Sequence, residues 1–247
     1  MTNVPVVLVT GAARRVGAEI ARALHVAGAR VAIHYRSSAD AANALAAELN
    51  ATRPESAASF AADLLDIAAL PRLVDAVVRR FGRLDALVNN ASSFFATKVG
   101  AVDTAAWDDL IGSNLKAPLF LSQAAAPHLE QSAGCIVNIT DIHAERPLKG
   151  YPLYCAAKAG LLGLSRSLAL ELGPRVRVNA VAPGAIEWPQ SQSDFSPAER
   201  AAIIDHTLLK RVGSPADIAR TVKVLVFDAP YVTGQVINVD GGRTAHL

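Results

Sequence analysis

Strand-like and helix-like segments alternate along almost the whole chain, and this alternation is the strongest constraint on its fold. Short apolar, β-branched runs that are typical of buried strands occupy residues 4–9, 31–35, 59–62, 84–88, 136–140, 176–182 and 235–239. Ala/Leu-rich stretches that are typical of helices lie between them at 16–27, 39–50, 67–81, 105–130 and 154–172. Such alternation predicts an α/β fold in which a doubly wound parallel sheet carries helices on both faces.

The composition fits one globular domain and argues against several other classes of protein. The chain has 247 residues, of which 51% are hydrophobic and 19% charged, so it can bury a large core. We therefore expect a single domain over residues 1–247. A net charge of +2 without a basic, aromatic-rich run argues against nucleic acid as a partner. No apolar run approaches the length of a membrane span, and the His residues lack the spacing of metal ligands.

Cysteine usage and the N-terminal residues together predict a cytoplasmic protein. Cys135 and Cys155 are too few for a disulfide framework, which indicates a reducing compartment. The chain enters a strand almost at once, which leaves no room for a signal peptide.

The turn between the first strand and the first helix has the sequence T-G-A-A-R-R-V-G, from Thr10 to Gly17. A glycine-containing turn at a helix N-terminus can bind a pyrophosphate through free N–H groups and the helix dipole. A plain strand-to-helix turn would have the same context, but the position after the first strand favours cofactor binding. We therefore predict that this turn binds a dinucleotide cofactor.

The end of the second strand indicates which dinucleotide binds. A cofactor with a free ribose 2′-hydroxyl usually meets an acidic residue there, whereas this chain has His34, Tyr35, Arg36 and Ser37. Arg36 and Ser37 suit a 2′-phosphate, because a guanidinium pairs well with phosphate oxygens. Asp40 is the acidic alternative, but its place in the first turn of the next helix suits the helix dipole. The sequence therefore favours NADP(H).

A tyrosine and a lysine lie four residues apart near the start of the helix at 154–172. That spacing places Tyr154 and Lys158 one turn apart on the same helix face. A nearby ammonium is expected to lower the pKa of the phenol below its free value of ~10, so Tyr154 could act as a general acid near neutral pH. Asp141, at the carboxyl end of the strand at 136–140, could join them. Tyr–Lys pairs are common on helices, so this pair indicates an active site only together with the other motifs.

The motifs as an ordered set resemble the short-chain dehydrogenase/reductase family over essentially the whole chain. They are Thr10-Gly11…Gly17, Asn89-Asn90-Ala91, Asn114, Tyr154…Lys158 and Pro183-Gly184. The resemblance implies a single Rossmann domain and hydride transfer from a nicotinamide cofactor. It gives Tyr154 the role of proton donor and Lys158 that of a ribose ligand that lowers the tyrosine pKa. Asn114 would hold a water in a proton relay, and Asp63 would contact the adenine.

The same resemblance implies a set of cofactor-binding residues and an assembly. The set comprises Gly11, Arg14, Arg15, Val16, Tyr35, Arg36, Ser37, Asp63, Leu64, Asn90, Ala91, Ser92, Tyr154, Lys158, Pro183 and Gly184. The family also implies a homotetramer that uses the helices near 108–130 and 151–172. The tail from Arg243 to Leu247 could reach a neighbouring subunit.

One departure from the family pattern changes the expected chemistry. The usual catalytic serine lies thirteen residues before the tyrosine, and this chain has Asp141 there. The neighbouring Thr140 is a poor substitute, because adjacent strand residues point to opposite faces. A serine hydroxyl can donate a hydrogen bond to a ketone oxygen, whereas an ionised carboxylate only accepts. Asp141 therefore suits a substrate with N–H donors or a C=N bond, unless the site is inactive.

This departure, Arg15 in place of the usual glycine, and the segments H-Y-R-S and N-N-A-S-S-F together resemble the pteridine reductases. These enzymes use NADPH to reduce dihydropteridines such as dihydrobiopterin or dihydromonapterin, and some also reduce folates. The resemblance implies that Phe94 stacks on the pterin, opposite the nicotinamide. Ser92 and Arg15 would contact pterin or cofactor phosphates, with Asp141 and Tyr154 along the reducible edge. Trp188 would cover the substrate or anchor a lid at about residues 185–206, which also contains Phe195.

Two alternatives remain open from the sequence. One is a carbonyl or 3-oxoacyl reductase of the same family, which would need another hydroxyl donor in place of Asp141. The other is a non-catalytic NADP-binding regulatory protein, for which Tyr154 would be dispensable.

Overall fold

The computed structural model describes residues 4–188 and 196–245 and contains one seven-stranded parallel sheet. The strand order is β3-β2-β1-β4-β5-β6-β7. The strands are β1 (Val6–Val9), β2 (Arg30–Tyr35), β3 (Ala57–Ala61), β4 (Ala86–Asn89), β5 (Cys135–Ile139), β6 (Arg177–Pro183) and β7 (Val236–Val239). The order reverses between β1 and β4, which places a ligand-binding crevice at their carboxyl ends. The predicted doubly wound α/β fold is confirmed.

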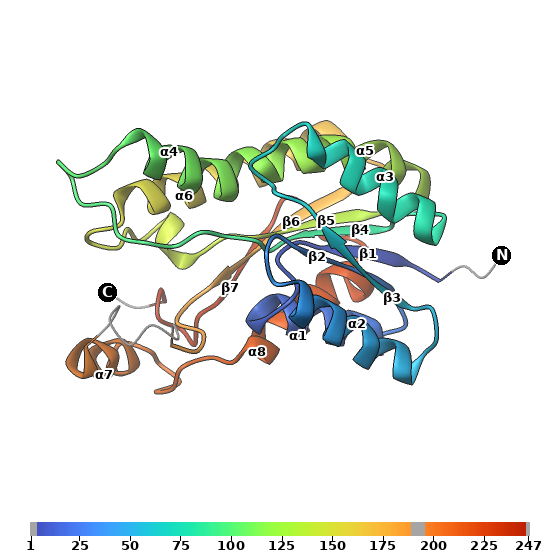
Figure 1. Ribbon diagram of the computed structural model, residues 1–247. Coiled ribbons are helices and arrows are strands. Elements are labelled where there is room, and N and C mark those ends of the chain that lie inside the picture. Colours follow the sequence, from blue (N-terminus) through green and yellow to red (C-terminus); the bar gives the residue numbers. More distant parts are fainter. Residues whose placement is uncertain (1–3, 189–195, 246–247) are drawn as a thin grey trace.

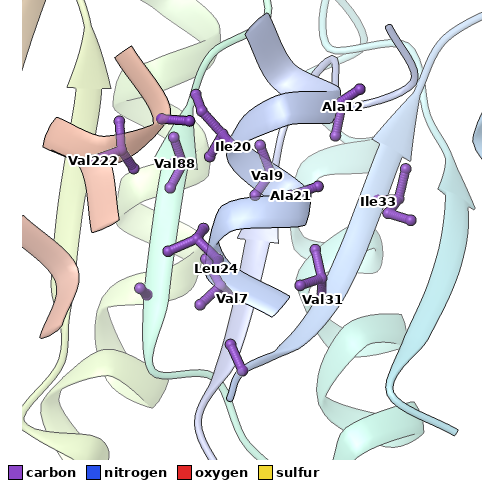
Figure 2. Close-up of a cluster of buried hydrophobic side chains, with 14 of the residues drawn as sticks. Val7, Val9, Ala12, Ile20, Ala21, Leu24, Val31, Ile33, Val88 and Val222 are labelled. Atoms are coloured by element: carbon purple, nitrogen blue, oxygen red, sulfur yellow. The ribbon is translucent and has the colours of Figure 1, made fainter. Parts of the chain in front are cut away.

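Helices cover both faces of this sheet (Figure 1). On one face lie α1 (Arg15–Val26), α2 (Ala39–Thr52) and α8 (Pro215–Lys223), and on the other α3 (Ala69–Phe81), α4 (Thr104–Ile111), α5 (Ala117–Ser132) and α6 (Pro152–Leu172). Alternate residues of β1 divide between two cores: Val7 and Val9 pack toward α1, and Leu8 packs toward α3 and α5. Figure 2 shows the first core around Ile20 and Leu24.

The helix predicted at 105–130 is interrupted in the structure. A π-helical turn, Gly112–Lys116, separates α4 from α5. Pro118 has no N–H to donate to the carbonyl of Asn114, so the regular α-helical ladder cannot continue through this point. The interruption places Asn114 in the wide turn, and such turns often occur at functional sites.

The helices of the C-terminal region were not predicted from the sequence. α7 (Pro197–Asp205) and α8 each begin at a Ser-Pro-Ala-acid sequence. Ser196 with Glu199, and Ser214 with Asp217, form capping boxes, and this pattern is a readable start signal. The second half of the predicted lid is therefore helical. Phe195 lies outside the described residues.

The helices expected at a subunit interface carry exposed apolar side chains. Trp107 on α4, Leu119 on α5 and Leu170 on α6 are exposed, and the three helices cover the same face of the sheet (Figure 1). The homotetramer stays a prediction. Within residues 4–188 and 196–245, no helix has the length and hydropathy that a membrane span requires.

Candidate active site

A cavity of about 540 Å³ lies at the carboxyl edge of the sheet. It is bordered by the first turn, the loops that follow β3 to β6, the start of α6, Ile203 of α7 and Arg243 after β7. We call this cavity the cleft. Its volume falls within the ~300–1,000 Å³ that is usual for small-molecule and cofactor sites.

The first turn is tied to the loop after β4. The Thr10 hydroxyl accepts from the backbone N–H groups of Asn90 and Ala91 at 2.9 and 3.0 Å. The Asn90 amide donates to the Thr10 carbonyl at 2.8 Å. A Cβ at Gly17 would lie 2.3 Å from the Gly11 carbonyl oxygen, so glycine is needed there. The first turn of α1 contains no acidic residue, and its N-cap side chain makes no capping bond. Its N–H groups therefore suit a phosphate.

Arg15 and Glu187 both have left-handed backbone conformations, with φ of +50° and +45°. Such a conformation costs a non-glycine residue about 1 kcal/mol or more and often marks a functional segment. The Arg15 guanidinium lies 3.5 Å from the Glu187 carbonyl oxygen, at the limit of a hydrogen bond. Arg15 thus brings the phosphate-binding turn close to the segment that follows β6.

His34 is a buried residue of the cleft wall that the sequence analysis did not select. Its Nδ1 accepts from the Gly11 N–H at 3.1 Å, and its Nε2 lies 3.1 Å from the Ala62 carbonyl oxygen. These partners require a neutral ring that carries its proton on Nε2. Burial lowers the pKa of His34 to about 4. His34 therefore links the first turn to the end of β3, next to Asp63.

Replacing His34 with asparagine should reduce the acid sensitivity of the fold. The folded-state pKa of about 4 lies below the ordinary ~6.5, so the unfolded chain binds the extra proton first as the pH falls. The wild-type free energy of unfolding should therefore drop between pH ~6.5 and ~4 by on the order of 3 kcal/mol from this residue. Denaturant titrations across that range measure the drop. The asparagine amide offers an acceptor and a donor but does not titrate, so an equal drop in this variant would contradict the assignment.

Asn114 lies one layer behind the cleft wall and is fully buried. Its side-chain amide donates to the carbonyls of Leu110 and Ser93, both at 3.0 Å. Its oxygen accepts from the Ser92 hydroxyl at 2.8 Å. The hydrogen bond from Asn114 to the Leu110 carbonyl crosses the start of the π-helical turn. The turn therefore holds the Asn114 amide so that it faces the loop after β4. Asn114 thereby fixes the loop that carries Ser92 and Phe94.

Asp141 and Tyr154 form the central pair of the cleft. The Tyr154 hydroxyl donates to Asp141 Oδ2 at 2.8 Å. Asp141 Oδ1 accepts from the His143 N–H, also at 2.8 Å, and caps the short 3₁₀ turn Ile142–Ala144. The predicted meeting of strand-end acid and helix tyrosine is thus confirmed. Thr140, in contrast, donates its hydroxyl to the Val181 carbonyl within the sheet.

The expected lowering of the Tyr154 pKa is wrong for this structure. Burial raises the pKa of Tyr154 well above its ordinary value, and the Asp141 carboxylate raises it further. The Lys158 ammonium donates to the Ile139 carbonyl at 2.9 Å and lies 5.7 Å from the centre of the tyrosine ring. Burial lowers the pKa of Lys158 to about 8, although Asp141 opposes the shift. The carboxylate in direct contact therefore outweighs the more distant cation, and Tyr154 holds its proton.

The Phe94 ring lies in the cleft wall and is 37% exposed, and the adjacent Phe95 is 39% exposed. Phe94 stacks on Tyr151, with ring centres 4.7 Å apart, and meets Tyr154 edge-on at 4.8 Å. These contacts hold the ring beside the Asp141–Tyr154 pair. Both phenylalanine rings are therefore partly open to solvent.

Most of the residues predicted for the site lie in the cleft wall: Gly11, Arg14, Arg15, Val16, Arg36, Asp63, Leu64, Asn90, Ala91, Ser92, Phe94, Asp141, Tyr154, Lys158, Pro183, Gly184 and Trp188. Tyr35 instead packs against the core below α1 and α2, and Ser37 is exposed outside the wall. The wall also contains His34, Ser93, His143 and Arg243, which were not predicted. Arg243 thus lies in the cleft of its own chain.

The first turn, which suits a phosphate, lies at the reversal of a parallel sheet and shares its cleft with a buried tyrosine and lysine. This combination indicates a nicotinamide-dependent oxidoreductase. A family model described as enoyl-(acyl carrier protein) reductase matches residues 11–244. Pteridine reductase 1 of Leishmania tarentolae is 40% identical, over 96% of each chain. A 3-oxoacyl-[acyl-carrier-protein] reductase of Staphylococcus epidermidis is 38% identical, over 95% of this chain and 97% of that protein.

A solved structure described as a short-chain alcohol dehydrogenase of Sinorhizobium meliloti has a TM-score of 0.93 and 33% identity, covering 98% of this chain and 97% of that one. The chain belongs to the short-chain dehydrogenase/reductase family. The family relation establishes an oxidoreductase that uses a nicotinamide cofactor.

Proposed function

We propose that this protein is an NADPH-dependent pteridine reductase. It would reduce a dihydropteridine such as dihydrobiopterin or dihydromonapterin to the tetrahydro form. The observation that carries the proposal is the hydrogen bond from the Tyr154 hydroxyl to Asp141 in the cleft wall, at 2.8 Å. This pair puts a proton donor beside an acceptor-only carboxylate, where a ketone reductase would need a second donor.

The cleft residues fit NADPH at the end that would hold the adenosine. Arg14, Arg15 and Arg36 lie in the wall near the first turn and the end of β2, where they would neutralise the pyrophosphate and the 2′-phosphate. Asp63 Oδ1 accepts from the Leu65 N–H at 3.0 Å, which fixes the carboxylate where an adenine amino group could reach it. When bound, NADPH supplies the hydride.

Replacing Arg36 with alanine should weaken NADPH binding by roughly 10–100-fold, because a charge-assisted contact to the 2′-phosphate is lost. NADH binding should change less than threefold. Fluorescence titration of both cofactors measures the two constants. Arg175→Ala, which removes an exposed arginine before β6 at the opposite edge of the sheet, is the matched control and should leave both unchanged. An equal loss for NADH and NADPH would contradict the 2′-phosphate assignment.

At the substrate end, three side chains suit a flat nitrogen heterocycle. The exposed Phe94 ring can stack on one face of such a ring. Asp141 can accept from its N–H groups, and Tyr154 can deliver a proton to its ring nitrogen. Because burial keeps the Tyr154 phenol protonated, the pair is prepared for the reductive direction. The Lys158 ammonium lies 5.7 Å from the centre of the Tyr154 ring and donates to the Ile139 carbonyl. The second contact holds the start of α6 against the end of β5.

Anaerobic oxidation of NADPH with dihydrobiopterin or dihydromonapterin tests the proposal, with an acetoacetyl thioester as the ketone substrate. We expect turnover of a dihydropteridine and little reduction of the ketone. Turnover of the ketone alone would instead establish a 3-oxoacyl reductase, which the Staphylococcus relative makes the main alternative. Binding of NADPH without turnover of either substrate would favour a regulatory protein.

A further inference from the structure

The Arg243 guanidinium stands apart from the arginines that suit the cofactor. Arg36 follows β2, whereas Arg243 follows β7, and β1, β4, β5 and β6 lie between those strands. Five strand spacings of about 4.8 Å separate the two strands by about 24 Å. Gly184, predicted to bind the cofactor, follows β6, and Arg243 follows the next strand of the sheet. Arg243 therefore lies beyond the predicted cofactor ligands, at the end of the cleft opposite Arg36, which leaves it to the substrate.

The backbone that presents Arg243 is firmly held. Asp240 accepts from the Gly242 N–H and from the N–H and hydroxyl of Thr244, at 2.9, 2.8 and 2.6 Å. A Cβ at Gly184 would lie 2.8 Å from the Asp240 Cα, so the turn packs directly against the end of β6. The position of Arg243 in the cleft wall is thus built into the fold.

The surroundings of Arg243 leave its charge available. Among the described residues, none forms a hydrogen bond or ion pair with its guanidinium. Trp188 and Ile203 lie in the same wall and offer apolar surface. The Arg200 guanidinium lies 5.2 Å from the centre of the Trp188 ring. Glu187 precedes Trp188 in this wall and is exposed to solvent, and the other acidic residues of the wall are Asp63 and Asp141.

We propose that Arg243 binds an anionic group, a carboxylate or a phosphate, at the end of the substrate's side chain. The inference rests on the proposed pteridine reductase function. A heterocycle stacked on Phe94 would send its side chain along Trp188 and Ile203 toward the guanidinium, which would form charge-assisted hydrogen bonds with the anion. Arg243 would then determine which pteridines the enzyme prefers.

The test compares three substrates in wild type and Arg243→Gln: dihydrobiopterin, with an uncharged side chain; dihydrofolate, with carboxylates; and dihydroneopterin phosphate. We expect Arg243→Gln to raise KM about tenfold or more for at least one charged substrate, as the loss of a charge-assisted bond predicts. The KM for dihydrobiopterin and kcat for all substrates should stay within twofold. Arg243→Lys should recover part of the loss, and the remote Arg175→Gln should have no effect.

The outcomes separate this inference from the proposed function. An effect on dihydrofolate identifies a carboxylate as the recognised group, and an effect on dihydroneopterin phosphate identifies a phosphate. If wild type reduces dihydrobiopterin but Arg243→Gln changes all three KM values equally, or none, the Arg243 inference alone is wrong. If wild type reduces none of the three and no dihydromonapterin either, the proposed function is wrong, and the inference is wrong with it.

Discussion

Replacing Tyr154 with phenylalanine is expected to lower kcat by ~10²–10⁴-fold, the usual contribution of a positioned general acid. The phenol donates to Asp141 at 2.8 Å, and burial holds its proton in place, so no other group can supply that proton from the same position. The phenylalanine ring would keep the edge-on contact with Phe94. The Kd for NADPH should therefore change less than threefold. Stopped-flow measurement of NADPH oxidation and fluorescence titration give the two values.

Tyr151→Phe is the matched control, because Tyr151 stacks on Phe94 within the same cluster but is not part of the cleft wall. Its turnover should stay within about threefold of wild type, since the stacked ring is retained. If Tyr154→Phe instead keeps more than a tenth of wild-type turnover, Tyr154 is not the proton donor. Such a result would mean that a different group, or a bound water, delivers the proton to the substrate.

Replacing Asp141 with serine is expected to shift the substrate preference from dihydropteridines toward ketones. The value of kcat/KM for a dihydropteridine should fall roughly 10–100-fold, because a charged acceptor for the substrate N–H groups is lost. Reduction of an acetoacetyl thioester should rise, because a hydroxyl can donate to a carbonyl oxygen. The pKa of Tyr154 should also fall, since the negative charge and the accepting oxygen are removed, although burial remains. Steady-state kinetics with both substrates measure the shift.

Asp141→Asn provides the isosteric control. Its amide oxygen can still accept from the His143 N–H and cap the 3₁₀ turn, so local structure is kept while the charge is lost. It should lose pteridine reduction, because the carboxylate charge is gone; its ketone reduction is not diagnostic, since the amide NH2 can also donate to a carbonyl oxygen. If Asp141→Ser left pteridine reduction intact, the carboxylate would have no role in substrate choice, and the ketone reductase alternative would gain support.

The fold could be predicted because it follows from local patterns. Each strand is a short apolar run between glycine-, proline- or asparagine-containing turns, and the helices between strands require parallel pairing. The interruption at Gly112–Lys116 was missed because it depends on one absent N–H, at Pro118, inside an otherwise regular helical pattern. The capped starts of α7 and α8 were readable but lay in a Pro- and Ser-rich region that suggested a loop.

The site could be predicted only where motif residues themselves line the cleft. Asp141 and Tyr154 were expected to meet, because one ends a strand and the other begins the next helix. The direction of the Tyr154 pKa shift was not predictable, because it depends on burial and on whether the carboxylate or the ammonium lies closer. His34 and Arg243 were missed for a related reason: each acquires its role from segments that are distant in sequence, Ala62 for His34 and the end of β6 for Arg243.

The buried phenol also bears on the direction in which the catalyst works. Oxidation of a tetrahydro product would have to begin with Tyr154 ionised, and the Asp141 carboxylate together with burial makes that phenolate scarce at neutral pH. The forward and reverse reactions share one equilibrium constant, but the reverse reaction starts from a sparsely populated protonation state. The scarce phenolate therefore limits how fast the reverse reaction can begin, whereas the concentrations of substrate, product and cofactor set the direction of net flux.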